Sequence, residues 1–276
     1  MITSQDWTFA GSRGSVTARA WRDDDAAPRY VVLLAHGYGE HIRRYEHVAA
    51  ALVADGAAVY GPDHIGHGRS DGERVLIDDY DDVLADLSVV HERAVAEHPT
   101  LPVVLIGHSM GGMIAARYAQ LHGDELTAVV LSGPVIGEFA LLDVLLAPDG
   151  DLDVAIDVAT LSRDDAVGAA YAADPLVWHG PFKRPTVEAM AATVAAIDAG
   201  GSLGALPMMW IHGAEDALVP IDGSRPGVER VRGDVHVEHV YEGARHEVFN
   251  ETNGAEVLAD VIAFIHRVLD TAPAAH

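Results

Sequence analysis

The order of apolar and polar positions along the chain predicts alternating strands and helices. Short continuous apolar runs, which are typical of buried parallel strands, separate longer stretches with helical spacing. The runs that predict strands are 31–35, 57–60, 103–106, 128–131, 208–212 and 235–241, and the predicted helices are 45–54, 79–97, a stretch ending near 122, 224–231 and 253–269. Strands that alternate with helices in this way indicate an α/β fold with a mostly parallel central sheet.

Two regions depart from this alternation. Residues 7–10 and 15–22 predict short strands joined by a glycine-containing turn, which indicates an N-terminal hairpin. Residues 136–204 contain no convincing buried strand, only short helical patterns cut by glycine and proline. We therefore expect an α/β-hydrolase-type core made of residues 1–135 and 205–276, with 136–204 as a helical cap. The cap would lie over the carboxyl-terminal edge of the strands, where open α/β sheets bind ligands.

Composition narrows the function classes. The chain has 276 residues, of which 49% are hydrophobic, so it can bury a large core. Its net charge of −24 argues against nucleic-acid binding, and its lack of cysteine excludes disulfides and thiolate chemistry. The N-terminus lacks the features of a secretion signal, and no apolar run has the length needed to span a bilayer. We expect a cytoplasmic protein, and residues 271–276 predict a frayed tail.

A glycine-rich turn carries the first chemical signal. Residues 107–111, Gly-His-Ser-Met-Gly, follow an apolar strand run and precede a helix-forming stretch, which is the G-x-S-x-G pattern in its strand–turn–helix context. The glycines allow a strained turn that lifts Ser109 away from the sheet. The Met110 N–H, at the positive end of the helix, can then donate to an oxyanion. The alternative is a glycine-rich turn with an incidental serine, but the context favours a nucleophile.

A serine nucleophile needs a histidine base held by a carboxylate, in the chain order Ser, Asp or Glu, His. Glu215 and Asp216 follow the predicted strand 208–212. Adjacent side chains rarely face the same way, so only one of these two carboxylates is expected to address the histidine. His246 follows the last predicted strand and a turn, just before the terminal helix. Alone it reads equally well as a surface histidine, but its order after Ser109 favours the base.

The loop after the first buried strand supplies a second oxyanion donor. In His-Gly-Tyr-Gly (36–39), the glycine lets the backbone approach closely, so the Tyr38 N–H could join that of Met110. The histidine pairs 36/41 and 64/67 lie in glycine-rich loops without cysteine or a separate ligand cluster, so no metal site is expected. No phosphate-binding glycine loop is present either. The residues predict hydrolysis without a cofactor.

Taken together, these motifs resemble the monoacylglycerol lipase family of α/β-hydrolases, also called the serine aminopeptidase S33 or hydrolase 4 type, and bacterial members most of all. The resemblance covers nearly the whole chain. Its most specific segments are 35–49, 62–75, 107–112, 171–180, 212–224 and 241–251. It implies that Ser109 is the nucleophile, Asp216 rather than Glu215 the triad acid, and His246 the base. It also places Tyr38 and Met110 at the oxyanion hole.

The resemblance further implies a substrate and its contacts. Glu40, His108 and Tyr171 fall on positions that bind the glycerol head group, and Arg44 falls on an arginine that braces this region. The implied reaction is cleavage of a monoacylglycerol, a small lipid ester, to fatty acid and glycerol. A carboxylesterase or lysophospholipase with another alcohol group is the nearest alternative, and a non-catalytic binder of the same fold is the alternative from a different class.

The cap and two loops leave questions open. Residues 139–147 are too short to span a membrane, and they suit equally an acyl-tunnel wall that contacts lipid aggregates and a helix packed on its own core. Arg245 stands where the family commonly has an aromatic residue, and Ile65 where it usually has an arginine. Pro226 and Gly227 interrupt a predicted helix, which is therefore expected to start late or to kink.

Overall fold

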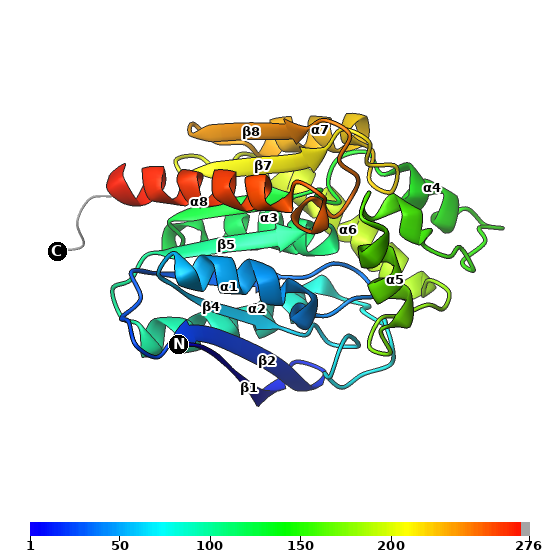
Figure 1. Cartoon of the computed structure of the whole chain (residues 1–276). Helices are drawn as coiled ribbons and strands as arrows, with labels where there is room; N and C mark the ends of the chain where they lie inside the picture. Colours follow the sequence, from blue (N-terminus) through cyan, green and yellow to red (C-terminus); the bar gives the residue numbers. More distant parts are fainter. Residues whose placement is uncertain (272–276) are drawn as a thin grey trace.

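The structure, a computed structural model, describes residues 1–271 and has an eight-stranded sheet at its centre (Figure 1). The strands lie in the order β1-β2-β4-β3-β5-β6-β7-β8. Their bounds are β1 Ile2–Gly11, β2 Gly14–Asp23, β3 Tyr30–Ala35, β4 Ala57–Pro62, β5 Val103–His108, β6 Ala128–Ser132, β7 Met208–Gly213 and β8 His236–Tyr241. β1 and β2 form an antiparallel hairpin, β2 also pairs antiparallel with β4, and the remaining pairs are parallel. The predicted α/β-hydrolase fold is confirmed.

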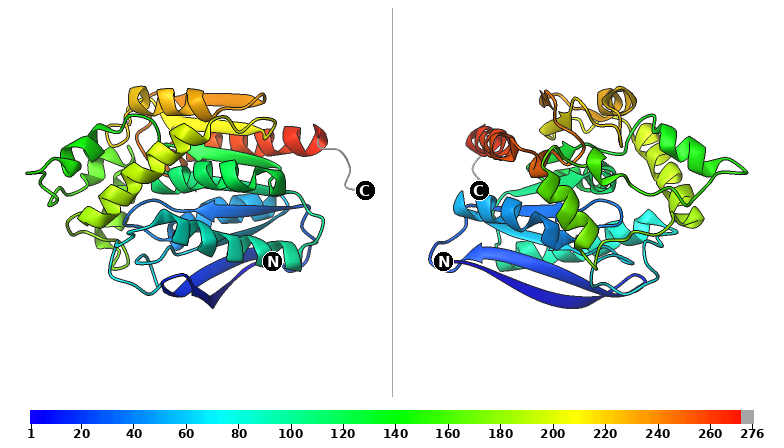
Figure 2. Two further views of the ribbon diagram at one scale, coloured as in Figure 1. Left: turned by 180° about the vertical axis from the view of Figure 1, so that it is seen from behind. Right: turned by 45° about the vertical axis from the view of Figure 1, so that its right-hand side comes forward.

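Helices cover both faces of the sheet. The α-helices are α1 Glu46–Ala54, α2 Tyr80–Glu97, α3 Met110–His122, α4 Ala140–Leu146, α5 Asp165–Ala173, α6 Arg184–Gly200, α7 Ile221–Val231 and α8 Gly254–Thr271. Short 3₁₀ turns are η1 Ile42–Tyr45, η2 Gly123–Glu125, η3 Val158–Thr160 and η4 Val248–Asn250. Helices α1 and α8 lie on one face, and α2, α3, α6 and α7 on the other (Figures 1 and 2).

This double cover explains the continuous apolar runs. Side chains alternate between the two faces of a strand, so a strand covered on both sides must be apolar at successive positions. In β3, Leu33 packs into the core beneath α2 and α3, whereas its neighbours Val32 and Leu34 pack into the core beneath α1 and α8. Every residue of β3 and β5 is buried. Burying each valine, leucine or isoleucine side chain of these strands contributes roughly 1.5–3 kcal/mol.

The segment between β6 and β7 holds α4, η3, α5 and α6, and the structure places no strand between residues 136 and 204. Helices α4 and α5 lie beyond the carboxyl ends of the strands, at the right of Figure 1. Helix α6 also packs against α3 and α7, so it belongs to the helix layer on the sheet as well as to the cap. The division into a core and a 136–204 cap remains our proposal. Within residues 1–271, no helix is long and apolar enough to cross a bilayer.

Helix α7 differs from the expectation drawn from Pro226. It begins at Ile221 and runs through Pro226 to Val231, so the expected late start is wrong. The proline falls in the second turn, where the bond it forfeits is to Asp222, while the first-turn amides of Gly223 and Ser224 still donate to the Pro220 carbonyl at 3.0 and 3.2 Å. Most of the predicted frayed tail, residues 272–276, lies outside the described residues.

Candidate active site

The turn between β5 and α3 holds Ser109 in a strained conformation. Its φ of 57° lies in the left-handed region, which is uncommon for residues other than glycine. The Ser109 N–H donates to the Ser132 carbonyl at 2.9 Å, and its own carbonyl accepts from Met113 at 3.1 Å. A Cβ atom at Gly107 would overlap the backbone of Gly111, so the chain can pass this closely only with glycine there. The turn therefore presents Ser109 at the N-terminus of α3, as its pattern predicts.

His246 and Asp216 meet at the carboxyl ends of β8 and β7. His246 Nδ1 lies 2.7 Å from Asp216 Oδ2, and both side chains are buried. Asp216 Oδ1 accepts the backbone N–H groups of Leu218 and Val219 at 3.0 and 2.8 Å. Glu215 is exposed and makes no hydrogen bond to His246 within the described residues. Of the two adjacent carboxylates left open by the spacing, Asp216 is the one that contacts the histidine.

A second buried histidine, His212, supports this carboxylate. The Trp210 indole, which can only donate, gives its hydrogen to His212 Nδ1 at 3.1 Å, so Nε2 carries the ring hydrogen. His212 Nε2 lies 2.9 Å from the Val219 carbonyl and 3.3 Å from Asp216 Oδ2. The sequence analysis missed His212. The strand period of two, which puts Trp210 and His212 on one face of β7, is the signal that could have pointed to it.

The electrostatics of the pair suit a base held by an acid. Burial disfavours a charged imidazole, but the Asp216 carboxylate more than offsets this and raises the pKa of His246 above the usual value of 6.5. Burial disfavours the charged form of Asp216 as well, but His246 and the hydrogen bond from His212 hold the pKa of this carboxyl well below its usual range. Asp216 is therefore ionised at neutral pH and stabilises a proton on His246.

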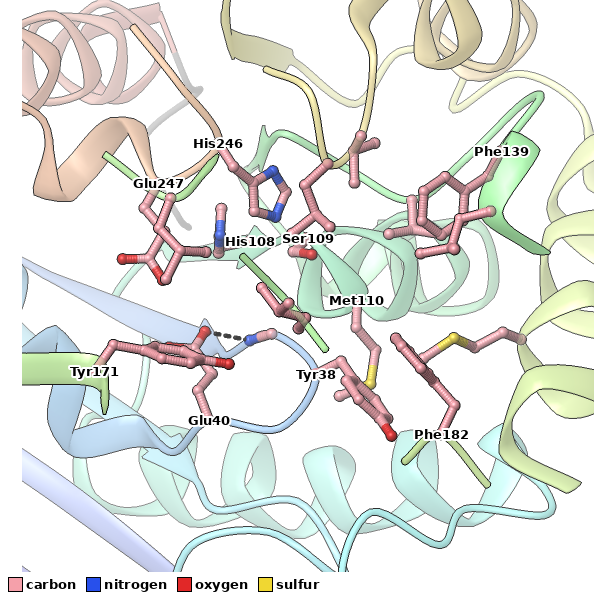
Figure 3. Close-up of a pocket in the computed structure, with 18 of the residues that line it drawn as sticks. Tyr38, Glu40, His108, Ser109, Met110, Phe139, Tyr171, Phe182, His246 and Glu247 are labelled. Atoms are coloured by element: carbon pink, nitrogen blue, oxygen red, sulfur yellow. Dashed lines mark hydrogen bonds between the residues drawn. The ribbon is translucent and has the colours of Figure 1, made fainter. Parts of the chain in front are cut away.

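Ser109 and His246 line the same pocket and lie next to each other in it (Figure 3). Within residues 1–271, the structure forms no hydrogen bond between the Ser109 hydroxyl and His246. Because Asp216 engages Nδ1, Nε2 is the nitrogen that remains for the serine. In structures without substrate, such catalytic hydrogen bonds are often long and tighten only in the substrate complex.

The candidate oxyanion donors also line this pocket. Met110 is the first residue of α3, so its N–H has no acceptor within the helix. The neighbouring Gly37 N–H donates to Glu40 Oε1 at 2.6 Å (Figure 3), so this amide is already engaged. Tyr38, the next residue, has an amide that donates no hydrogen bond within residues 1–271, so it stays a candidate donor.

Glu40, Arg44 and Glu247 form a buried ion network on one side of Ser109. Arg44 Nη1 donates to Glu40 Oε2 at 2.5 Å and to Glu247 Oε1 at 2.6 Å, and Nη2 donates to Glu247 Oε2 at 2.8 Å. Glu40 Oε1 also accepts from the Tyr45 hydroxyl at 2.7 Å. Arg44 therefore holds both carboxylates in place.

The neighbours of this network define its charge. Burial disfavours the charged form of Glu247, but Arg44 outweighs it and lowers the pKa to about 2. Burial and the nearby His246 lower the pKa of His108 to about 3, so its ring is neutral. His108 Nδ1 lies 3.0 Å from the Ser132 hydroxyl. The Arg44 guanidinium stacks over the Tyr171 ring at 4.8 Å from its centre.

Glu247 is the main residue of the site that the sequence analysis missed. It lies directly after His246, but it is 203 positions from the arginine that it binds. No local spacing or periodicity relates two residues so far apart, so no signal in a single sequence identifies this pair.

The opposite side of Ser109 is apolar. Phe182 stacks on the Tyr38 ring, with centroids 4.7 Å apart and planes inclined by 10°. Side chains from the segment between β6 and β7 and from the loop after β7 complete this side, namely Val135, Phe139, Leu141, Met190 and Leu218. Figure 3 shows the arrangement, with Glu40, His108, Tyr171 and Glu247 on one side of Ser109 and Phe139 and Phe182 on the other. The pocket thus has a polar end and an apolar end, which meet at the serine.

The remaining histidine pairs lie beneath the glycine loops. His36 Nδ1 donates to the Gly37 carbonyl at 2.8 Å, and its Nε2 accepts from the His64 backbone at 3.0 Å. Burial lowers the pKa of His64 to about 3 and that of His67 to about 4, so both rings are neutral. His41 contacts Asp174 at 2.9 Å. These rings pack and position the loops that carry Tyr38 and Glu40.

Comparison with known proteins shows which family the chain belongs to. The family model of serine aminopeptidase, S33, matches residues 26–253. A monoacylglycerol lipase of Mycolicibacterium smegmatis is 40% identical over 95% of this chain and 97% of its own length. The chain belongs to the serine aminopeptidase S33 family. This confirms the resemblance seen in the motifs, and the protein is a hydrolase.

Another curated relative and a solved structure are also similar to this chain. Human monoglyceride lipase is 29% identical over 84% of this chain and 80% of its own. A soluble variant of monoglyceride lipase from Saccharomyces cerevisiae, solved with a substrate analogue, matches with a TM-score of 0.82 and 22% identity over 96% of this chain and 94% of its own. At that identity, the structural match supports the fold alone.

Proposed function

We propose that this hydrolase cleaves the ester bond of monoacylglycerols to give glycerol and a free fatty acid. The observation that carries the proposal is the division of the pocket at Ser109 into a polar and an apolar end. A monoacylglycerol has the matching division, with a small polyol on one side of its ester and a hydrocarbon chain on the other. The name of the 40% identical relative, monoacylglycerol lipase, supports the same substrate.

In the proposed first half of the reaction, Ser109 Oγ attacks the ester carbonyl while His246 Nε2 takes its proton. Asp216 keeps the hydrogen on Nδ1 and stabilises the imidazolium that forms. The negative charge that develops on the carbonyl oxygen is held by the backbone N–H groups of Tyr38 and Met110, with help from the positive end of α3. The tetrahedral intermediate then collapses, glycerol departs with the proton from Nε2, and the acyl group stays on Ser109.

In the second half, water enters and His246 takes a proton from it. The resulting hydroxide attacks the acyl-enzyme carbonyl, and the same two amides hold the second oxyanion. When this intermediate collapses, Ser109 Oγ recovers its proton from His246 and the fatty acid is released. No group outside the chain and water is needed for either half.

The polar end provides acceptors for the alcohol. The carboxylates of Glu40 and Glu247 accept hydrogen bonds, and hydroxyl groups of glycerol donate them. His108 and Tyr171 line the same end, and Arg44 holds the carboxylates in position. We assign Glu40, His108 and Tyr171 to glycerol binding, with Arg44 as the residue that positions the carboxylates.

Hydrolysis rates across alcohols test this function. The panel pairs a monoacylglycerol with a lysophospholipid and a short nitrophenyl ester, at several acyl chain lengths. The proposal expects the highest kcat/KM for the monoacylglycerol. A clear preference for either other ester would instead support a lysophospholipase or a general carboxylesterase. Failure of a fluorophosphonate probe to label Ser109 would support a non-catalytic binder.

We also propose that the cap meets lipid aggregates through the outer face of α4 and that the enzyme works in the cytoplasm. Leu142 and Leu145 of this helix are buried, whereas Val144 is 57% exposed. Leu141 lines the apolar end of the pocket, so α4 lies between that end and solvent. Flotation with monoacylglycerol-containing liposomes, compared between the wild type and Val144→Asp, tests the contact. Equal floating fractions for the two proteins would contradict it.

A further inference from the structure

We propose that Glu247 is a specificity residue whose charge excludes anionic head groups, phosphate monoesters above all, from the alcohol end of the pocket. The inference rests on the proposed function, because it concerns which acylated alcohols the pocket accepts. It assigns a role to a carboxylate that does not itself take part in the proposed acyl transfer.

The charge of the polar end opposes an anion. Among the described residues that line the pocket, Arg44 faces the two carboxylates of Glu40 and Glu247. His108 is neutral and adds no positive charge. The ionised Asp216 lies behind His246 and adds a further negative charge. The end of the pocket that would receive the alcohol is therefore negative overall.

Carboxylates already accept most of the hydrogen bonds that the tip of Arg44 can donate. Both of its terminal nitrogens donate to carboxylates, Nη1 to Glu40 and Glu247 and Nη2 to Glu247. One face of the guanidinium is covered by the Tyr171 ring. A phosphate group that entered would meet acceptors where it needs donors, whereas a glycerol hydroxyl can donate to the same oxygens.

The repulsion between Glu247 and a bound anion is large enough to decide between substrates. In a buried pocket with an effective permittivity near 20, a like unit charge about 5 Å away weakens binding roughly 100-fold. Screening by salt is small for groups this buried. One unit of charge on Glu247 is therefore enough to separate a neutral alcohol from a phosphorylated one.

Glu247 can be changed with less damage than Glu40. Glu40 Oε1 also holds the Gly37 amide and the Tyr45 hydroxyl, so its loss would disturb the loop that carries Tyr38. Apart from Arg44, the Glu247 side chain accepts only from Asn250 Nδ2, at 2.7 Å, within the described residues. In Glu247→Gln, the amide oxygen can still accept from Arg44, and Arg44 keeps its partner Glu40. The variant removes charge while nearly preserving shape.

The test compares two substrates with the same medium-length acyl chain, a 1-acylglycerol and a 1-acylglycerol-3-phosphate. We expect the wild type to prefer the neutral substrate by at least ~100-fold in kcat/KM. Glu247→Gln should reduce this preference at least ~10-fold, mainly by improving kcat/KM for the phosphate. Glu247→Asp keeps the charge but shortens the side chain, so it should retain the preference. Glu138→Gln removes an exposed charge beside Phe139 and should leave the preference unchanged.

The outcomes separate this inference from the proposed function. If the wild type hydrolyses neither substrate, the proposed function fails before any variant is compared. If it hydrolyses the monoacylglycerol but Glu247→Gln keeps the full preference, the inference alone is overturned. An equal loss of preference in Glu247→Asp and Glu247→Gln would assign the effect to shape and also overturn it.

The pH dependence of kcat/KM provides a second test, because the charge of Glu247 also acts on His246. The Glu247 carboxylate favours the protonated form of His246, so its removal lowers the pKa of that ring. The acid limb of the kcat/KM profile should therefore move to lower pH in Glu247→Gln and stay in place in Glu138→Gln. A purely structural role for Glu247 would not move this limb, and an unmoved limb would contradict the charge mechanism.

Discussion

The two ends of the pocket are built by different physics. At the polar end, Glu40 and Arg44 come from the segment after β3 and Glu247 from the loop after β8. Hydrogen bonds fix the orientation of each of these charged side chains. At the apolar end, Phe139, Leu141 and other side chains from the cap region and α6 present surface without directional bonds. The polar end can therefore exclude an alcohol that has one misplaced polar group, whereas binding at the apolar end depends mainly on the volume of the acyl chain.

Magnitudes sharpen the contrast. A site built around hydrogen bonds discriminates by roughly 10⁴–10⁵ when its buried polar groups lose their partners, whereas one methylene in an apolar pocket is worth only about 10–200-fold. We therefore expect steep selectivity for the alcohol and shallow selectivity for the acyl chain. Substitutions at the boundary between the two ends, which is Ser109 and the residues that act on it, should have the largest effects. Substitutions within one end should have smaller effects.

The largest effect is expected at the boundary. Ser109→Ala removes the proposed nucleophile, so kcat should fall roughly 10⁴-fold or more for every alcohol and every acyl chain. Steady-state hydrolysis of a monoacylglycerol measures this. Near-normal turnover by the variant would refute the assignment of Ser109.

The next effect concerns the acid behind the boundary. Asp216→Asn can no longer hold the His246 hydrogen on Nδ1, and kcat should fall roughly 10³–10⁴-fold. The matched control Glu215→Gln alters the adjacent, exposed carboxylate and should stay within about twofold of the wild type. The reverse ranking in kcat would move the triad acid by one residue.

A change at the polar end should affect the alcohol alone. Arg44→Lys keeps the charge but cannot bind two carboxylates with a planar fork, so Glu40 and Glu247 lose their fixed positions. We expect kcat/KM for a monoacylglycerol to fall about 10-fold, which corresponds to the loss of one charged hydrogen bond. The kcat/KM for the methyl ester of the same acid should change little. An equal fall for both esters would show that Arg44 acts on the reaction centre instead.

A change at the apolar end should affect the acyl chain alone. Leu141→Trp adds volume at a half-buried position that lines the pocket, so kcat/KM should fall about 3–10-fold for long chains and little for short ones. Leu121→Trp makes the same substitution at an exposed position near the C-terminal end of α3, away from this pocket, and serves as the control. Equal losses for both variants would contradict the assignment of Leu141 to an acyl wall.

The smallest predicted effect is a shift of the acid limb of the kcat/KM profile to a pH above 6.5. The proposed base works only when His246 is neutral, and its pKa lies above 6.5. The ring is protonated below that pKa, so kcat/KM should fall as pH drops through a value above 6.5. A kcat/KM profile measures the limb, and one that lies below pH 6.5 would contradict the electrostatic description of the Asp216–His246 pair.

The sequence predicts some residues of the site but not others. The serine turn and the loops of Asp216 and His246 stand next to buried strands, so local pattern and chain order place them. Contacts between distant positions have no local signal. Arg44 lies in η1 and Glu247 in the loop after β8, and only the fold brings these two segments together.

The cap shows the same limit. Short helical patterns between 136 and 204 predict a region without strands, but they do not show that α6 packs along α3 and α7. Pro226 misleads for a related reason. Local propensity predicts a break there, whereas the first turn of α7 is held by hydrogen bonds to Pro220 and by close packing of Gly227 against Gly137.

The central claim is that the ester is divided at Ser109, with the alcohol at the polar end and the acyl chain at the apolar end. The most direct test measures kcat/KM for monoacylglycerols and methyl esters at two chain lengths, in the wild type, Arg44→Lys and Leu141→Trp. The account predicts that Arg44→Lys changes only the preference between alcohols and Leu141→Trp only the preference between chain lengths. If each variant changes both preferences equally, the pocket is not divided in this way and the claim fails.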